Sequence, residues 1–280
     1  MREYEQLGHM KEANHDPLRG ELVYYIPHHC VHKKFRVVFN ASCKTESGVS
    51  LKEIQMLGEK LQRDLAEIIM RFRRRRICIS CDVKMMFRQV RIIESQYDLQ
   101  RIFWRESPRD RLREYCLTVV TYGMTASAYL AVRCLIQAAR EQMEYFPSAA
   151  RAIIDDFYMD DGITGASNED KAIKLAKEMK FALGGAGMKL CKWKSNSKAL
   201  ASVLQSGEPS ALLLTEDDNA SVLGLQWMTD EDEFTFVVKV PVVPAVITKR
   251  IILSCVAQLY DPNGYITPVT FIGKIIVQDL

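Results

Sequence analysis

The sequence predicts an α+β fold in which antiparallel strands pack on helices. Three observations favour this class: short β-branched or aromatic runs, a helical apolar stripe in residues 50–76, and a hairpin-like segment at 153–164 that carries aspartates. The chain has 280 residues, of which 48% are hydrophobic and 26% are charged. This composition is typical of a globular protein with ample core material, and it excludes disordered and collagen-like chains.

The first part of the chain is predicted to contain a tail, a hairpin and a helix. Residues 1–20 are polar, so we expect an N-terminal tail. The apolar runs at 22–27 and 35–39 flank a basic, His-rich turn and predict a hairpin. Apolar residues at three- and four-residue spacing predict a helix over 50–76, which ends in the arginine-rich run 71–76.

The middle of the chain alternates strands with a helix. Residues 77–83 (ICISCDV) form a short apolar run that is typical of a buried strand, with Asp82 at its far end. Two further strands are predicted at 102–104 and 115–121. A helix is predicted at 127–145, where apolar residues recur on one stripe.

The last part begins with the acidic hairpin at 153–164. Ser167 is predicted to cap a helix that ends at Gly184. Two strands and a helix follow, at residues 221–228, 233–240 and 249–259.

Composition excludes several functional classes. A net charge of +3 does not by itself indicate a nucleic-acid binder. No apolar run approaches the roughly 20 residues of a membrane span, and the N-terminus lacks the apolar core of a signal peptide. Eight cysteines spread through a long chain favour buried, reduced thiols over structural disulfides. We therefore expect an intracellular protein that is not secreted.

Three aspartates lie where a charge is unexpected. Asp82 ends an apolar strand, and Asp160 and Asp161 lie at the predicted hairpin tip. Neighbouring strands lie about 4.8 Å apart, so these carboxylates could converge. Oxygen ligands without His or Cys partners suit Mg²⁺, and two such ions serve nucleotidyl transfer. Because Asp-Asp pairs are also common in turns, and Asp155-Asp156 is a second pair, spacing alone does not decide which pair is functional.

The residues around these aspartates resemble the motifs of reverse transcriptases. Residues 158–161 (YMDD) are similar to the Tyr-x-Asp-Asp box, 82–90 (DVKMMFRQV) to the motif with the first aspartate, and 122–131 (YGMTASAYLA) to the nucleotide-facing motif between them. Shorter matches narrow the resemblance to the BEL/Pao class of LTR retrotransposons, over about residues 20–280, at 36–39, 47–51, 71–73, 100–105, 188–193 and 253–262.

The resemblance implies a right-hand polymerase fold, with an antiparallel palm sheet packed on helices and a truncated thumb or connection. The implied parts are fingers at 21–57 and 90–127, palm at 58–89 and 128–237, and the start of the thumb or connection at 238–280. The implied activity is RNA-directed DNA synthesis, in which dNTPs are transferred to a primer 3′-hydroxyl. Asp82, Asp160 and Asp161 would bind two Mg²⁺ ions, with Mn²⁺ as a substitute.

The resemblance also implies a nucleotide-binding set, formed by Arg36, Phe87, Tyr122, Gly123 and Lys192. Phe87 would be the steric gate against a ribose 2′-hydroxyl, the alternative being an aromatic residue that only packs. Arg36 would contact the triphosphate. Lys192 would protonate pyrophosphate, although it is equally consistent with a solvated lysine at a strand end. The implied primer grip is a hairpin formed by Leu223, Gly224, Leu225, Gln226 and Trp227.

The implied partners are an RNA or DNA template-primer, dNTPs, and protease, ribonuclease H and integrase segments of a parent polyprotein. No membrane partner is expected, and the implied location is a cytoplasmic particle or the nucleus. This chain itself shows no recognisable ribonuclease H or integrase segment, nor the Asp-Thr/Ser-Gly turn of an aspartic protease. The alternative function is that of an inactive or domesticated remnant that only binds nucleic acid or protein.

The sequence also contains an arginine-rich run, a histidine cluster and a pair of cysteines in one strand. The run 71–76 is either a solvated helix end or a contact with template phosphates. We expect no zinc site in the cluster His28–His32, because no matching second cluster exists. We expect no redox function for Cys78 and Cys81, since they lie in a buried strand.

Overall fold

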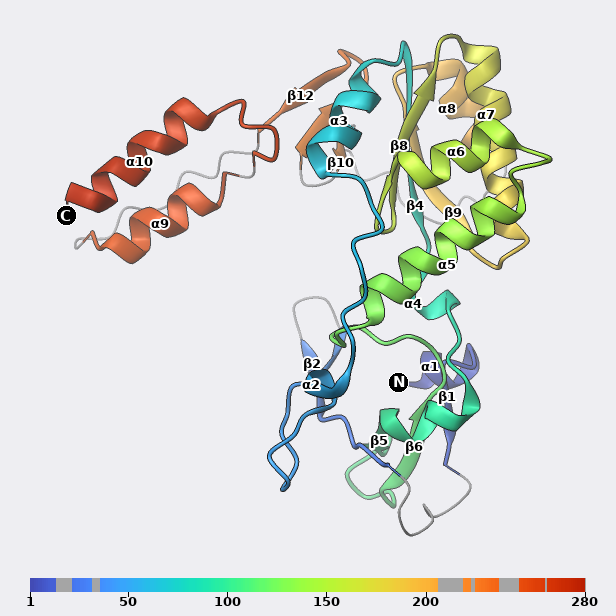
Figure 1. Cartoon of the computed structure of the whole chain (residues 1–280), viewed down its shortest axis with the longest axis vertical. Helices are drawn as coiled ribbons and strands as arrows, with labels where there is room; N and C mark the ends of the chain where they lie inside the picture. The colour runs from blue at the N-terminus through green and yellow to red at the C-terminus, as the bar shows by residue number, and fades with distance from the viewer. Residues whose placement is uncertain are drawn as a thin grey trace. The chain divides into compact units, whose positions relative to one another are not determined.

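The computed structural model describes residues 1–13, 22–31, 36–205, 219–222, 225–236, 247–259 and 261–279. The chain divides into two compact units that alternate along the sequence (Figure 1). The segments of the first unit are Met1–Leu61, Lys84–Glu141 and Leu183–Met188; those of the second are Gln62–Val83, Gln142–Ala182 and Lys189–Leu280. All ladders between the described strands are antiparallel, so the predicted α+β class is confirmed.

The described part of the first unit contains a three-stranded sheet, ordered β1-β6-β5, and the hairpin β2-β3. Its strands are β1 (Met10–Glu12), β2 (His28–Val31), β3 (Arg36–Phe39), β5 (Arg101–Trp104) and β6 (Arg113–Leu117). Its helices are α1 (Arg2–Gln6), α2 (Leu51–Ile54), α4 (Met86–Gln89), the 3₁₀ helix η1 (Glu94–Gln100) and α5 (Ser127–Glu141).

The predicted N-terminal tail is wrong for residues 1–13. These residues form α1 and β1, and β1 pairs with β6, where Met10 lies opposite Leu117. Tyr4 and Met10 are 6% and 2% exposed and belong to the core of this unit. The polar composition of the segment gives no sign of these two buried residues, because their partners are distant in the sequence: Leu117 lies opposite Met10, and the Phe39 ring contacts that of Tyr4. Residues 14–20 lie outside the described part of the chain.

The predicted hairpin forms from different residues. The His-rich stretch, predicted as the turn, is strand β2, and it pairs with β3 so that His28 lies opposite Phe39. Residues 22–27 instead contact β5 through an isolated bridge between Tyr25 and Arg101.

The predicted helix over 50–76 is interrupted. It forms as α2 and as α3 (Leu65–Arg73), with non-helical residues between them. Gly58 explains part of the interruption, because its φ is +82° and a Cβ there would lie 2.3 Å from the ring of Tyr129. Only glycine fits this close approach. Leu57, one of the apolar residues within the predicted helix, is 70% exposed.

The described part of the second unit contains a four-stranded sheet, ordered β7-β8-β4-β9, and a smaller sheet, ordered β10-β11-β12. The strands are β4 (Ile77–Val83), β7 (Phe157–Tyr158), β8 (Asp161–Ala166), β9 (Leu190–Ser195), β10 (Asn219–Val222), β11 (Leu225–Met228) and β12 (Glu233–Thr235). The helices are α3, α6 (Pro147–Asp155), most of α7 (Glu169–Gly184), α8 (Lys198–Gln205), α9 (Lys249–Ala257) and α10 (Thr267–Asp279).

Strand β4 has the bounds that its apolar run predicts, and it is covered on both faces. On one face, Cys78 packs with Phe72 of α3 and with Trp227 of β11. At alternate positions on the other face, Ile79 and Val83 are fully buried. Burial on both faces is the reason that this strand reads as a nearly continuous apolar run.

Two other predictions in the second unit need correction. The start of the predicted hairpin at 153–164 is the end of helix α6, so the hairpin is shorter and consists of β7 and the beginning of β8. Helix α7 is capped by Asn168, whose side chain accepts a hydrogen bond from the Lys171 amide, and not by Ser167. None of the described helices is long and apolar enough to cross a membrane.

Candidate active site

The two acidic motifs meet at one end of the β4-β8 ladder. Asp82 and Asp161 are direct cross-strand partners, so their side chains lie on the same face with Cβ atoms about 4.5–5.5 Å apart. The Val83 amide donates to the Asp160 carbonyl at 2.8 Å, which extends the ladder to the next residue. The sheet therefore gathers three aspartates that are separated by about eighty residues in the sequence.

A tight turn presents Asp160 and Asp161. Tyr158 pairs with Asp161, so Met159 and Asp160 are the two central residues of the hairpin. Met159 has a φ of 56°, in a position where glycine is the favoured residue. A positive φ costs a non-glycine residue on the order of 1–3 kcal/mol, and such backbone strain tends to occur at functional sites.

Gly162 has a packing role beside the hairpin and is not one of its turn residues. It lies in β8 opposite Cys81. A Cβ at this position would lie 2.4 Å from the ring of Phe157 and 2.8 Å from the Cys81 sulfur. Glycine is thus required for β7 and β4 to approach β8, which fixes the position of the acidic turn.

A β-bulge in β9 places Lys192 beside Asp82. Ser80 pairs with Lys194 and Asp82 pairs with Cys191, so β9 has one residue more than β4 over this stretch. Lys192 has a φ of 52°, and its ammonium lies 2.9 Å from Oδ2 of Asp82. The hydrogen bond to Asp82 raises the pKa of Lys192, so this group is a cation at neutral pH.

Cys191 was not predicted as a site residue. Its thiol donates to Oδ1 of Asp82 at 3.5 Å, so both carboxylate oxygens of Asp82 have partners from β9. The sequence indicates this contact only through the position of Cys191 next to Lys192, within the matching segment 188–193.

The environment of Asp161 disfavours its charged form. Burial, together with the negative charges of Asp160 and Asp82, raises the pKa of Asp161 to about 6, although Lys192 opposes the shift. A bound cation would relieve the repulsion between like charges held together in this way. Carboxylate oxygens in this number suit Mg²⁺, which takes one or two protein carboxylates and completes its shell with water and phosphate.

The chemistry of the donors fits Mg²⁺, but the present side-chain arrangement is not a completed metal site. No group of three or more His, Cys, Asp or Glu side chains is arranged to hold a metal ion anywhere in the described part of the chain. The Asp82 carboxylate is instead turned to Lys192. The backbone register brings the three aspartates together, and the cation beside Asp82 is the ammonium group of Lys192.

Asp155 and Asp156, the second Asp-Asp pair, have structural partners. Asp156 is 3% exposed, and it accepts hydrogen bonds from Arg71 and from the Thr164 hydroxyl, both at 2.7 Å. Asp155 pairs with Arg63 at 2.9 Å. The ion pair between Arg71 and Asp156 fastens α3 to the end of α6, so this second Asp-Asp pair is committed to the fold.

Three of the predicted nucleotide-binding residues lie together in the first unit. The rings of Phe87 and Tyr122 are 4.7 Å apart between centroids. Gly123 has a φ of +87°, and a Cβ there would lie 2.8 Å from the Phe39 carbonyl oxygen. Gly123 thus allows a close approach to the protein's own strand β3. Arg36 is exposed and begins the same strand.

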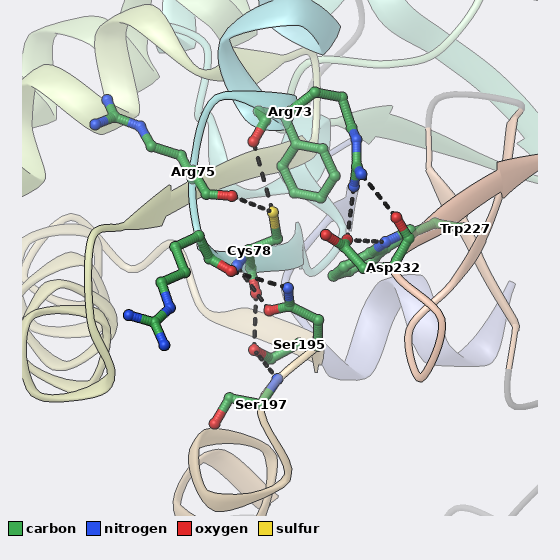
Figure 2. A network of polar contacts seen from close by, with 10 residues as sticks. Arg73, Arg75, Cys78, Ser195, Ser197, Trp227 and Asp232 are labelled. Atoms are coloured by element: carbon green, nitrogen blue, oxygen red, sulfur yellow. Dashed lines mark hydrogen bonds and ion pairs between the residues drawn. The ribbon is translucent and has the colours of Figure 1, made fainter.

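The predicted primer-grip hairpin is anchored on α3 (Figure 2). Trp227 is fully buried, and its indole donates to Oδ1 of Asp232 at 3.0 Å. Arg73 donates to the same carboxylate oxygen at 2.6 Å. Leu225 is also buried and Gln226 is half-buried. The side chains of Leu225 and Trp227 hold the hairpin in place; Leu223 and Gly224 lie outside the described residues.

The arginine-rich run lies at the opposite end of β4 from Asp82. Arg71 and Arg73 are engaged by Asp156 and Asp232, and the remaining arginines, residues 74–76, are exposed. This placement separates the run from the aspartate cluster by the length of a seven-residue strand. The run is therefore not part of the aspartate cluster, and both a solvated helix end and a contact with template phosphates elsewhere stay predictions.

Among the described residues of the cysteine and histidine clusters, no group is arranged to hold a metal ion. Burial raises the pKa of Cys78 to about 12 and raises that of Cys81, so neither thiol is reactive. All eight cysteines are free thiols. His28, His29 and Cys30 lie at successive positions of β2 and so alternate between its faces; His32 lies outside the described residues.

Replacing Asp161 with asparagine is expected to stabilise the protein above pH 6. Because the pKa of Asp161 is raised from 3.8 to about 6, the folded state binds this proton more tightly than the unfolded state does. The resulting stabilisation is complete below pH 3.8 and is lost as the pH rises through 6. Because the side chain is partly solvated, we expect a rise in melting temperature on the order of a few degrees at pH 8. The difference should disappear near pH 4. An unchanged or lower melting temperature at pH 8 would argue against crowded carboxylates.

Comparison with known proteins gives a partial family match and a fold likeness. Residues 248–280 match the family described as "Pao retrotransposon-like RNaseH-like domain". The fold is similar to a solved structure described as "Crystal structure of Prototype Foamy Virus Protease-Reverse Transcriptase (native)", with a TM-score of 0.50 and 14% identity, over 68% of this chain and 22% of that chain. This chain therefore spans about a fifth of that protein. No curated protein matches.

The family match corrects one expectation. No ribonuclease H segment is recognisable from the sequence alone, but residues 248–280 are similar to an RNaseH-like domain. The start of a thumb or connection at 238–280 stays a prediction. In the structure this region contains helices α9 and α10, which have no buried residues. Its only acidic residues are Asp261 and Asp279.

Proposed function

We propose that this chain carries an RNA-directed DNA polymerase centre from a retrotransposon polyprotein, with two-metal transfer of dNTPs to a primer 3′-hydroxyl. The observation that carries the proposal is the register of β4 and β8, which pairs Asp82 with Asp161 and leaves Asp160 in the adjoining turn. The motif order in the sequence, the likeness of the fold to a retroviral protease-reverse transcriptase and the retrotransposon family match support the same origin.

In the proposed mechanism, Asp82, Asp160 and Asp161 hold Mg²⁺. When bound, Mg²⁺ would activate the primer hydroxyl and neutralise the leaving pyrophosphate. The crowded like charges of the three half-buried carboxylates favour a divalent cation, and they are positioned before substrate arrives because the sheet fixes them. Lys192, a cation 2.9 Å from Asp82, holds a proton at Nζ that could be given to pyrophosphate.

The remaining roles belong to the same proposal. Phe87 would exclude the ribose 2′-hydroxyl, and Tyr122 and Gly123 would shape the nucleotide pocket. Arg36 would bind the triphosphate, since a guanidinium can contact two phosphate oxygens at once. The hairpin of residues 223–227 would hold the primer terminus.

Primer extension tests the proposed function. On an RNA template with Mg²⁺ and dNTPs, we expect the wild-type chain to extend a DNA primer, and Asp160→Asn to lower the rate by at least about a hundredfold. Asp155→Asn is the matched control and should retain activity, because Asp155 is engaged by Arg63. Equal activity in the wild-type and Asp160→Asn chains would support the alternative, a remnant that only binds nucleic acid or protein.

A second candidate function is suggested by the family match, namely nuclease activity of the RNaseH-like segment. Metal-dependent cleavage requires clustered carboxylates. Within residues 247–279, Asp261 accepts hydrogen bonds from the amides of Tyr265 and Ile266, at 2.9 and 2.7 Å, and so shapes a turn. The segment lacks further acidic residues apart from Asp279. We therefore expect residues 248–280 to contribute no cleavage of RNA in an RNA-DNA hybrid.

A further inference from the structure

The N-terminal segment, residues 1–13, is fastened to the first unit by backbone contacts. Strand β1 pairs with β6, and the Thr118 amide donates to the His9 carbonyl at 3.0 Å. The Thr118 hydroxyl donates to the Gly8 carbonyl at 2.7 Å, and the His9 amide to the Tyr4 carbonyl at 2.7 Å. Tyr4 is thus held at a fixed position with its side chain 6% exposed.

Tyr4 in turn orients Arg88. The Arg88 guanidinium donates a hydrogen bond to the Tyr4 hydroxyl, and its Cζ lies 3.9 Å from the centroid of the Tyr4 ring. The same Cζ lies 5.8 Å from the centroid of the Tyr122 ring. A planar guanidinium stacked on one aromatic ring and facing a second ring links the two by cation–π attraction.

Arg88 is also the residue that follows Phe87. Both lie in α4, a helix of only four residues, so the helix itself supplies little rigidity. The Phe87 ring contacts Tyr122 with centroids 4.7 Å apart. Fixing Arg88 between Tyr4 and Tyr122 therefore fixes the backbone that carries Phe87 and the ring against which Phe87 packs.

We propose that Tyr4 is a positioning residue for sugar discrimination, acting through Arg88 on the pair formed by Phe87 and Tyr122. This inference rests on the proposed function, in which Phe87 excludes the ribose 2′-hydroxyl. It assigns a role in substrate selection to residues 1–13, which lie outside every motif of the family resemblance. A steric gate discriminates only while its ring cannot move aside, so loss of the support behind it relaxes selection.

Nucleotide binding without chemistry tests this inference. The protein is bound to a template-primer whose primer ends in a dideoxynucleotide, and calorimetry gives the Kd values for dGTP and GTP opposite a template cytosine. We expect the ratio of the GTP Kd to the dGTP Kd to fall by about tenfold in Tyr4→Ala and in Arg88→Met. Tyr4→Phe keeps the ring under the guanidinium and should retain the ratio within about twofold.

Leu7→Ala is the matched control, because Leu7 directly follows α1 and is 49% exposed; it should keep the wild-type ratio. A ratio compares two ligands on one protein, so a reduced folded fraction does not change it. An unchanged ratio in both Tyr4→Ala and Arg88→Met would overturn the inference, as would a wild-type ratio near one. Failure of the wild-type chain to extend an ordinary primer, with the ratio effect intact, would overturn the polymerase proposal alone.

Discussion

Replacing Asp156 with alanine is expected to lower the free energy of unfolding by about 3–5 kcal/mol. The substitution removes a buried carboxylate that accepts hydrogen bonds from Arg71 and Thr164, both at 2.7 Å. Thr164 is 2% exposed, so its hydroxyl would be left buried without this partner, which is costly. Arg71 would lose the ion pair that fastens α3 to the end of α6.

Asp155→Ala is the matched control for this experiment. Its side chain is 26% exposed and its ion pairs with Arg63 and Arg71 lie near the surface, so the loss should be about 1 kcal/mol or less. Urea unfolding of the three proteins at pH 7 measures both values. A free energy of unfolding for Asp156→Ala within about 1 kcal/mol of wild type would show that the buried network contributes little.

The two Asp-Asp pairs thus differ in the sign of their effect on stability. Asp156 is stabilised by a cation and a hydroxyl donor, whereas Asp161 is crowded by Asp160 and Asp82. Neutralising the first should destabilise the fold, and neutralising the second should stabilise it above pH 6. A carboxylate that lowers stability in the absence of ligand is the kind of residue that a binding site retains.

Local sequence patterns predicted the elements that depend on local composition. Strand β4 has the bounds of its apolar run, and α5 and α7 follow their apolar stripes closely, because burial of one face or both leaves a periodic pattern. The expected convergence of Asp82 with Asp161 followed from placing both at strand ends, and the register agrees.

Features set by distant contacts could not be predicted. The bulge that directs Lys192 to Asp82 depends on the pairing of β9 with β4. The structure of residues 1–13 depends on the pairing of β1 with β6. The interruption at Gly58 depends on Tyr129, seventy-one residues further along. The two Asp-Asp pairs are told apart by the ion pairs that Arg63 and Arg71 form with Asp155 and Asp156. No spacing in the sequence connects these arginines to these aspartates.

The second large effect is expected on divalent-metal binding. Asp82→Asn and Asp161→Asn should each weaken Mn²⁺ binding by at least about tenfold, since each removes a charged oxygen ligand. Binding by the wild-type chain should itself weaken below pH 6, because the pKa of Asp161 is raised to about 6 and a ligand must be deprotonated. Asp155→Asn removes a nearby charge without removing a ligand, so it separates a specific site from general attraction.

The Mn²⁺ affinity of these four proteins, obtained at pH 7.5 by electron paramagnetic resonance, tests the metal centre most directly. We expect the wild-type and Asp155→Asn chains to bind with the same affinity, and Asp82→Asn and Asp161→Asn to bind at least about tenfold more weakly. Equal affinity in all four proteins would contradict a metal centre built from Asp82, Asp160 and Asp161.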